Sequence, residues 1–213
     1  MSELKQIERL YSHSYLSFIA TFFGAVLVFW FFQSIADPVV LNSWFIIFFI
    51  LTIIRIVVSW YFHKSEHENN SQNWLIAFLC LSMISGTLWG LTGFLLIPEG
   101  VLTLFESVLY HGMLLLFITA LIVGSLITYS ASKMVYLSFA FPAVVPQCLM
   151  LISKGDQYHS FLGGFVLAYA CIIFVISVYV YRIFLECSKT EIENEMLKKI
   201  LDKNGIPFDK VTN

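Results

Sequence analysis

Six apolar blocks, each about 20 residues long, alternate with short polar segments along this chain of 213 residues. An α-helix needs about 20 residues to cross the ~30 Å hydrocarbon layer of a bilayer, so every block is long enough to span it. Only 12% of the residues are charged, and nearly all of them fall between the blocks. That distribution avoids the cost of several kcal/mol for a charge at mid-membrane. The sequence therefore predicts an all-α membrane protein, a bundle of six transmembrane helices over residues 15–34, 44–63, 74–97, 105–129, 135–152 and 161–184.

The distribution of Lys and Arg predicts which helix ends face the cytoplasm. Positive charge gathers in the N-terminal segment, the second and fourth loops and the C-terminal segment, whereas the odd-numbered loops hold only Lys154. Because cytoplasmic loops carry the excess of Lys and Arg, both termini are expected in the cytoplasm. We expect a cytoplasmic N-terminal segment (1–13), a six-helix transmembrane domain (14–185), and a cytoplasmic stalk helix and tail (186–213).

The composition also limits which partners and cofactors the protein is expected to bind. The net charge is −2, and there is no basic patch of the kind that binds nucleic acid. The four cysteines form no CxxC pair, so neither a metal nor another cofactor is expected. The lipid bilayer is the one partner that the composition itself requires.

The segment after the sixth block predicts that its helix continues beyond the membrane. Residues 186–203 contain strong helix formers and no Pro or Gly, and Asn204-Gly205 is typical of a helix end. Ile192, Met196 and Ile200 fall on one apolar stripe. Such a seam favours a two-stranded coiled coil and hence a homodimer, although two heptads are marginal alone. The alternative is an amphipathic helix lying on the membrane or on the protein's own loops.

Arg55 is the most costly residue in the chain because it lies near the middle of the second block. It is predicted either to bind an anionic ligand group or counter-charge, or to be a structural arginine that snorkels or binds carbonyl groups. Glu106 and His111 lie in the first turns of the fourth block. One prediction is a cavity open to the outside, with His111 at mid-height and Arg55 at its floor. In the alternative, Glu106 is stabilised by the helix dipole and His111 is simply packed.

Small residues in the third block predict a close helix contact. Gly86 and Gly90 form a GxxxG pair that Gly93 extends, and small residues let another helix approach closely. The contact is expected either inside the protomer or at a dimer interface.

Two prolines in the fifth block predict irregular backbone there. Pro142 and Pro146 each free a backbone carbonyl, and the adjacent Gln147 is predicted to hydrogen-bond there. Gln147 and Trp89 join the three titratable residues above as candidates for ligand binding or gating.

No catalytic motif is recognisable along the chain. Ser85 precedes Gly86, but a serine nucleophile needs a base within hydrogen-bond reach, and none can be assigned from the sequence. GxSxG and HExxH motifs are absent, as are a selectivity-filter sequence and two halves with matching interrupted helices. The chain is therefore not expected to be an enzyme.

Four features together are similar to a known pattern. They are a mid-helix arginine in the second span, a Ser-Gly-x-x-Trp-Gly core in the third, prolines in the fifth, and a last span that leads to an arginine and a Glu-Asn-Glu helix. The chain resembles the six-helix N-terminal membrane sensory modules (MASE-type) of bacterial GGDEF diguanylate cyclases and hybrid sensor histidine kinases. The residues that carry this resemblance are Arg55, Trp60 to Lys64, Ser85, Gly86, Trp89, Gly90, Pro98, Pro142, Pro146, Gly155, Asp156, Arg182, Glu193, Asn194 and Glu195.

The resemblance implies a sensory module in a bacterial inner (plasma) membrane, and no ligand carries over from it. Our hypothesis is that a small signal, lipophilic or polar, binds within the bundle. The C-terminal helix would relay the signal to a fused output domain or a cytoplasmic partner, in cyclic di-GMP signalling or a two-component system. A shortened sensor and a stand-alone protein both remain open. The alternatives are a structural or assembly protein that binds another membrane protein, and a small transporter or channel.

Overall fold

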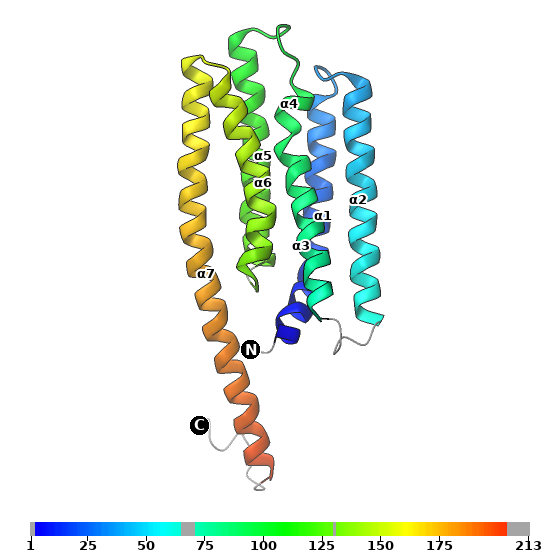
Figure 1. Cartoon of the computed structure of the whole chain (residues 1–213), viewed down its shortest axis with the longest axis vertical. Helices are drawn as coiled ribbons and strands as arrows, with labels where there is room; N and C mark the ends of the chain where they lie inside the picture. Colours follow the sequence, from blue (N-terminus) through cyan, green and yellow to red (C-terminus); the bar gives the residue numbers. More distant parts are fainter. Residues whose placement is uncertain (1–2, 65–70, 130, 204–213) are drawn as a thin grey trace.

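The computed structural model describes residues 3–64, 71–129 and 131–203, and over these ranges the chain forms seven α-helices and no strand (Figure 1). Six stretches are long and apolar enough to cross a membrane: Ser14–Phe32, Pro38–Lys64, Ser71–Leu96, Leu104–Leu126, Lys133–Ser153 and Gln157–Thr190. Each contains most of one predicted span, so the prediction of an all-α bundle of six membrane-spanning helices is confirmed. The helices are α1 (Glu3–Phe32), α2 (Pro38–Lys64), α3 (Ser71–Gly90), α4 (Thr92–Leu96), α5 (Leu104–Thr128), α6 (Lys133–Ser153) and α7 (Gln157–Lys203).

Side-chain caps explain where α2 and α5 begin. The backbone N–H groups of Val39 and Val40 donate to Asp37 Oδ1 at 2.8 and 3.1 Å, so α2 starts six residues before the predicted span. Thr103 and Glu106 cap α5 reciprocally: Thr103 N–H donates to Glu106 Oε2 at 2.9 Å, and Glu106 N–H donates to Thr103 Oγ1 at 3.3 Å. Glu106 therefore has the local, dipole-stabilised role that the sequence left open.

The glycine face of α3 packs against the backbone of α6, inside the protomer. A Cβ on Gly86 would lie 2.2 Å from the Phe139 carbonyl oxygen, and one on Gly90 would lie 2.0 Å from that of Pro142. These separations from backbone oxygens are too short for any side chain, so Gly86 and Gly90 are what allows the two helices to approach. Gly93 lies on α4, where an added Cβ would meet the flexible side chains of Gln147 and Met150 instead. Of the two predicted locations for this contact, the structure has the one within a single chain.

The third span is interrupted, and Gln147 occupies the interruption. α3 ends at Gly90 and α4 begins at Thr92, so carbonyl groups at the break lose their helical partners. Gln147 Nε2 donates to the Gly90 carbonyl at 3.0 Å and to Thr92 Oγ1 at 3.2 Å. The expectation that Gln147 serves carbonyls freed by its own prolines is wrong, because its side chain extends from α6 to the break in α3.

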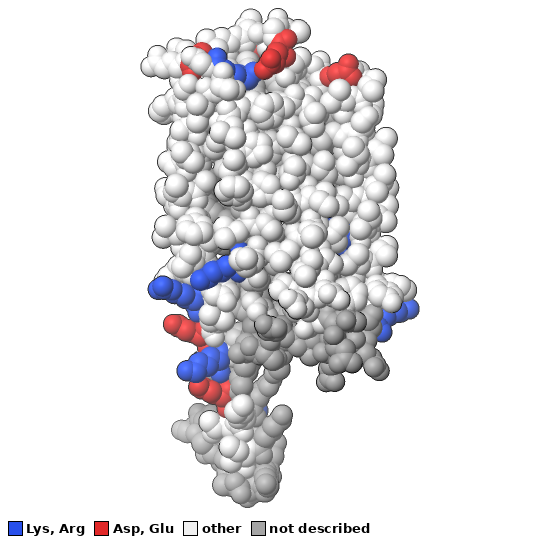
Figure 2. All heavy atoms as spheres, in the orientation of Figure 1, with Lys and Arg blue, Asp and Glu red and all other residues white. Residues whose placement is uncertain are grey.

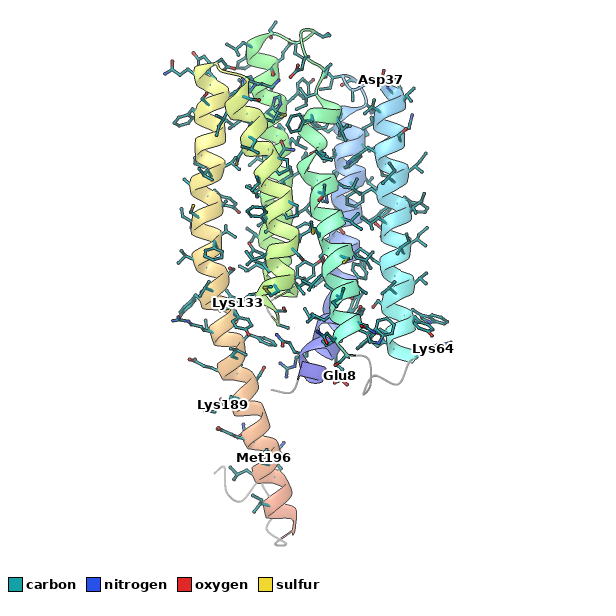
Figure 3. The ribbon with its side chains drawn as sticks, in the orientation of Figure 1. Glu8, Asp37, Lys64, Lys133, Lys189 and Met196 are labelled. Atoms are coloured by element: carbon teal, nitrogen blue, oxygen red, sulfur yellow. The ribbon has the colours of Figure 1, made fainter. Side chains whose placement is uncertain are left out.

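Charged side chains mark the two ends of the bundle. In Figure 2 the surface between the two ends is nearly uncharged. Acidic groups and a basic group lie at the upper end, and Lys and Arg outweigh acidic groups where the bundle meets the extended part of α7. Among the labelled side chains, Asp37 lies at one end, and Lys64, Lys133 and Lys189 lie at the other, together with Glu8 (Figure 3).

The last helix is much longer than a bilayer is thick. α7 has 47 residues, or about 70 Å at 1.5 Å per residue, and its C-terminal part projects beyond the other helices (Figure 1). Met196 and Ile200 are exposed on this projecting part, and Ile192 belongs to the same helix. The expected helix end and tail at 204–213 lie outside the described residues.

We expect Gly90→Ala to lower the free energy of unfolding by about 1–3 kcal/mol or more, because its Cβ cannot fit without separating α3 from α6. The matched control is Gly112→Ala on α5, where a Cβ meets nothing within 4 Å. Denaturant titration of both variants in mixed micelles is the measurement. Equal stability of the two would contradict the α3–α6 contact.

Candidate functional site: a buried arginine, a histidine cluster and an apolar groove

Neutral side chains from α1, from α3 and from the residue that follows α5 surround Arg55. Its side chain is 4% exposed, and its Nη2 donates to Tyr129 Oη at 2.6 Å. Nη1 lies 3.4 Å from Ser85 Oγ, and the guanidinium carbon lies 4.4 Å from the centre of the Phe18 ring. Tyr129 Oη in turn lies 2.8 Å from Ser17 Oγ. Hydrogen bonds and the ring face together compensate the charge.

This surrounding leaves Arg55 little chance to meet a ligand. No described carboxylate lies within 4.0 Å of it, and the free volume beside it is about 10 Å³, which holds one water at most. The cavity expected to join Arg55 to His111 is not formed. Tyr129, the partner of Arg55, follows His111 by 18 residues, which is about 27 Å along α5. Arg55 therefore has the surroundings of a structural arginine.

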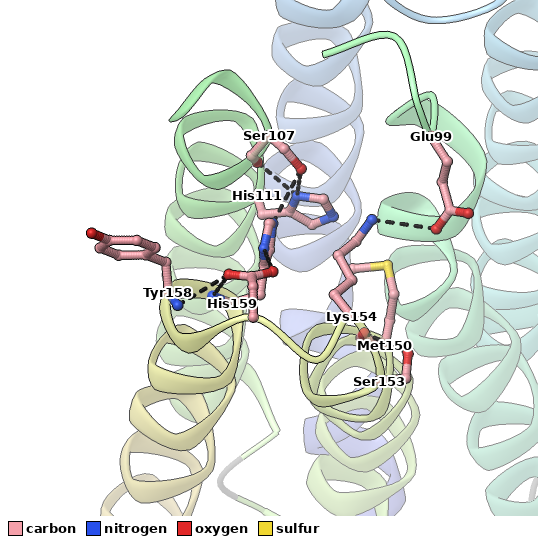
Figure 4. Close-up of polar contacts among 9 residues, drawn as sticks. Glu99, Ser107, His111, Met150, Ser153, Lys154, Tyr158 and His159 are labelled. Carbon is pink, nitrogen blue, oxygen red and sulfur yellow. Dashed lines mark hydrogen bonds and ion pairs between the residues drawn. The ribbon is translucent and has the colours of Figure 1, made fainter. Parts of the chain in front are cut away.

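His111 belongs to a separate polar cluster at the opposite end of the bundle (Figure 4). It is 1% exposed, and its Nδ1 lies 2.7 Å from the Ser107 carbonyl oxygen, which fixes the proton on Nδ1. Its Nε2 is buried and has no hydrogen-bond partner among the described residues. The ring of His159 stands edge-on to it, with centroids 5.1 Å apart and planes at 90°.

The start of α7 contributes the rest of this cluster. Asp156 Oδ1 accepts the backbone N–H groups of Tyr158 and His159 at 3.0 and 2.9 Å, which caps α7. Asp156 Oδ2 bonds His159 Nδ1, and His159 Nε2 lies 3.1 Å from Ser107 Oγ. The hydrogen bond from the His159 backbone is the main reason that the pKa of Asp156 lies below its ordinary value, so its carboxylate is charged at neutral pH. Lys154 and Glu99 form an ion pair of 3.3 Å beside the cluster.

An apolar groove of about 550 Å³ runs between α6 and α7. Its walls include Ala140 and Val144 from α6 and Ala170 and Phe174 from α7. Tyr136 also lines it: this side chain is 4% exposed, and its Oη is buried without a hydrogen-bond partner in the part of the chain that the structure describes. The volume falls in the range of about 300–1,000 Å³ that is typical of small-molecule sites.

Trp89 and Gln147 lie together but away from both polar clusters. Trp89 is fully buried against Trp44 and Phe48, with ring centroids 5.7 and 5.3 Å away, and Gln147 occupies the α3–α4 break. Trp89 therefore packs against rings and Gln147 hydrogen-bonds the break, while Trp89 Nε1 and Gln147 Oε1 are buried without a hydrogen-bond partner among the described residues. No group of three His, Cys, Asp or Glu side chains suited to a metal occurs within the described ranges.

Sequence reasoning missed Ser107, Asp156, His159 and Tyr136. The local sequence around these residues does not indicate a site: Asp156 looks like an ordinary helix cap after a glycine, and Tyr136 is one of many aromatic residues. The available signal was the pair of histidines at the start of two spans whose ends meet on one side of the membrane.

Comparison with protein-family models, curated proteins and solved structures finds no match to this chain.

We expect Tyr129→Phe to lower the free energy of unfolding by about 1–3 kcal/mol, because it leaves a buried guanidinium without its shortest hydrogen bond. Tyr179→Phe is the matched control, since Tyr179 is exposed on α7. Denaturant titration in mixed micelles measures both variants.

The double variant Arg55→Met with Tyr129→Phe should lose less stability than the two single losses add up to, because removing both partners leaves no charge to compensate. If the stability loss of the double variant equalled the sum of the two single losses, the contact between Arg55 and Tyr129 would make no contribution to stability.

Proposed function

We propose that this chain is a membrane sensory module that binds a lipophilic small molecule in the groove between α6 and α7 and relays its presence along α7. One observation carries the proposal: the groove is bounded by the same helix that leaves the bundle as a projecting stalk. A molecule that separates or twists α6 and α7 therefore acts directly on the stalk. The resemblance to MASE-type modules supports the same function.

The lining of the groove defines the class of ligand. Its side chains are apolar or aromatic, and it lies within two membrane-spanning stretches, where a hydrocarbon chain is the natural occupant. The buried hydroxyl of Tyr136 lacks a partner, and such a group is costly unless something bonds it. A ligand with a long apolar part and one polar group near Tyr136 meets both requirements.

The two walls of the groove differ in how firmly the bundle holds them. Within an apolar 18-residue stretch of each span, 50% of the residues are buried on α6, against 22% on α7. The glycine face of α3 holds α6, whereas much of α7 faces away from the other helices. Binding should therefore displace α7 rather than α6, and a ligand shifts such an equilibrium only by its difference in affinity for the two arrangements.

Charge supports an orientation with both termini in the cytoplasm of a bacterial inner membrane. The end from which the stalk projects carries Lys64, Lys133 and Lys189, and the opposite end carries Asp37 (Figure 3). This is the asymmetry that the positive-inside rule requires. The stalk would then meet a cytoplasmic output domain or partner protein, and its exposed Met196 and Ile200 would pair with a second copy.

We expect Ala140→Phe to fill the groove and to weaken binding of a dansyl-labelled fatty acid at least tenfold, as measured by fluorescence titration of the full chain in micelles. Tyr136→Phe should weaken it about 2- to 10-fold, the value of one hydrogen bond. The control, Tyr179→Phe, should bind as the wild type does.

Fused to a diguanylate cyclase reporter, Ala140→Phe should also change output, because the phenyl ring occupies the ligand's volume. Arg55→Leu, in the same reporter, tests the hypothesis that Arg55 binds the signal. Unchanged output in all conditions would show that Arg55 has a structural role only. If Ala140→Phe bound the probe like the wild type, the groove would not be its site. A stoichiometric membrane-protein partner, with no bound small molecule, would favour the assembly alternative.

We expect Met196→Lys with Ile200→Lys to abolish the crosslinked dimer in native membranes, because a lysine seam cannot pack against its copy. Glu193→Lys, an equal charge change on an exposed position of the same helix segment, should leave crosslinking intact. Dimers that survive the double variant would assign dimerisation to another surface.

A further inference from the structure

Three side chains at the end of the bundle opposite the stalk form a carboxylate–imidazole–hydroxyl series with the contacts of a nucleophilic triad. Asp156 Oδ2 bonds His159 Nδ1, and His159 Nε2 lies 3.1 Å from Ser107 Oγ. The carboxylate holds the His159 proton on Nδ1, so the lone pair of Nε2 faces the serine hydroxyl. Ser107 comes from α5, whereas the other two come from the start of α7 (Figure 4).

We propose that Ser107, His159 and Asp156 form an acyl-transfer site that cleaves carboxylic esters with long acyl chains at the outer surface of the membrane. Ser107 is the nucleophile, His159 is the general base and acid, and Asp156 is a positioning residue that acts through His159. This goes beyond the proposed sensory function and rests on different residues.

Helix capping does not account for these contacts. The backbone groups of Tyr158 and His159 need only Asp156 Oδ1, which accepts both. The second oxygen and the contact between His159 and Ser107 add nothing to the cap. Besides, Ser107 Oγ is the only polar side-chain atom that the structure places at hydrogen-bond distance from His159 Nε2 among the described residues.

His111 holds the other side of the site. Its Nδ1–H donates to the Ser107 carbonyl and lies 3.5 Å from Ser107 Oγ, and its ring stands edge-on to His159. Both imidazole rings are almost fully buried, while Ser107 is half-buried and accessible. The base is thus fixed in orientation, and the nucleophile remains within reach of a substrate.

The reaction follows from these positions. Ser107 Oγ attacks the ester carbonyl carbon as its proton passes to His159 Nε2, which forms a tetrahedral intermediate. The C–O bond to the alcohol breaks, and the alcohol leaves with the proton from Nε2. Water then attacks the acyl-serine, again with Nε2 as base. The products are a carboxylic acid and free Ser107, and Asp156 remains ionised throughout.

Location and surroundings define the substrate class. Ser107 is the fourth residue of α5, one turn inside the end that Thr103 and Glu106 cap. Phe105 and Phe161, each two residues along the chain from a member of the triad, are 77% and 75% exposed. At a membrane surface, where lipid ester groups meet water, such rings contact acyl chains.

The test uses the full chain in detergent micelles and a fluorophosphonate probe, with the labelled residue located by mass spectrometry. We expect wild-type labelling at Ser107, none there in Ser107→Ala, and a rate about 10²–10⁴-fold lower in His159→Gln. Ser153→Ala is the matched control, because Ser153 lies at the same end and its hydroxyl donates only to the Met150 carbonyl. Elution profile and thermal unfolding verify that each variant is folded.

Absence of label at Ser107 in folded wild-type protein would overturn the proposal, and so would equal p-nitrophenyl ester hydrolysis by wild type and Ser107→Ala. Asp156→Asn should lower the labelling rate in folded protein, and Asp156→Glu, which keeps a carboxylate to orient His159, should recover part of that rate. Equal labelling rates in these two variants would remove Asp156 from the site. Hydrolysis of octanoate no faster than acetate would overturn the long-chain substrate class.

Discussion

The close contact between the glycine face of α3 and the backbone of α6 organises the rest of the bundle. Between helices in hydrocarbon there is little hydrophobic driving force, so packing and hydrogen bonds must hold them together. Gly86 and Gly90 bring α3 onto the Phe139 and Pro142 carbonyl groups, and Gln147 closes the break between α3 and α4. α6 is thus packed closely against α3, whereas much of α7, which forms the other wall of the groove, is exposed.

The contacts of Arg55 meet a second requirement that the hydrocarbon of the membrane imposes. A guanidinium in hydrocarbon needs hydrogen bonds, and neutral groups supply them here: Tyr129 accepts from Arg55, and Ser17 bonds Tyr129. The arrangement ties α1, α2 and the end of α5 together near the end that carries most of the lysines. It also explains why an intramembrane charge, usually grounds for suspecting function, lacks the open volume that a ligand requires.

The sequence was sufficient for the spans, for the glycine face of the third span and for Arg55 as a buried charge that needs compensation, because hydropathy, small-residue spacing and charge cost are properties of single segments. It did not identify α6 as the helix that the glycine face contacts. It was insufficient wherever two segments must meet. Gln147 lies next to prolines in sequence but serves a break on another helix, and His111 shares a span with Tyr129 yet lies at its far end. Ser107 and His159 are 52 residues apart and meet only because two spans begin side by side. The groove has no sequence signature, since its lining resembles any lipid-facing surface.

The two proposals share one helix. His159 stands in the first turn of α7, Ala170 lines the groove about 16 Å further along, and the exposed seam follows beyond the bundle. On α6, Ile152 lines the groove just before the turn that holds Asp156. An acyl chain in the groove and an ester group at Ser107 would therefore lie on the same side of the molecule, with α7 in contact with both. Chemistry at one end and displacement of the stalk at the other need no separate pathway, because a single continuous helix forms part of each site.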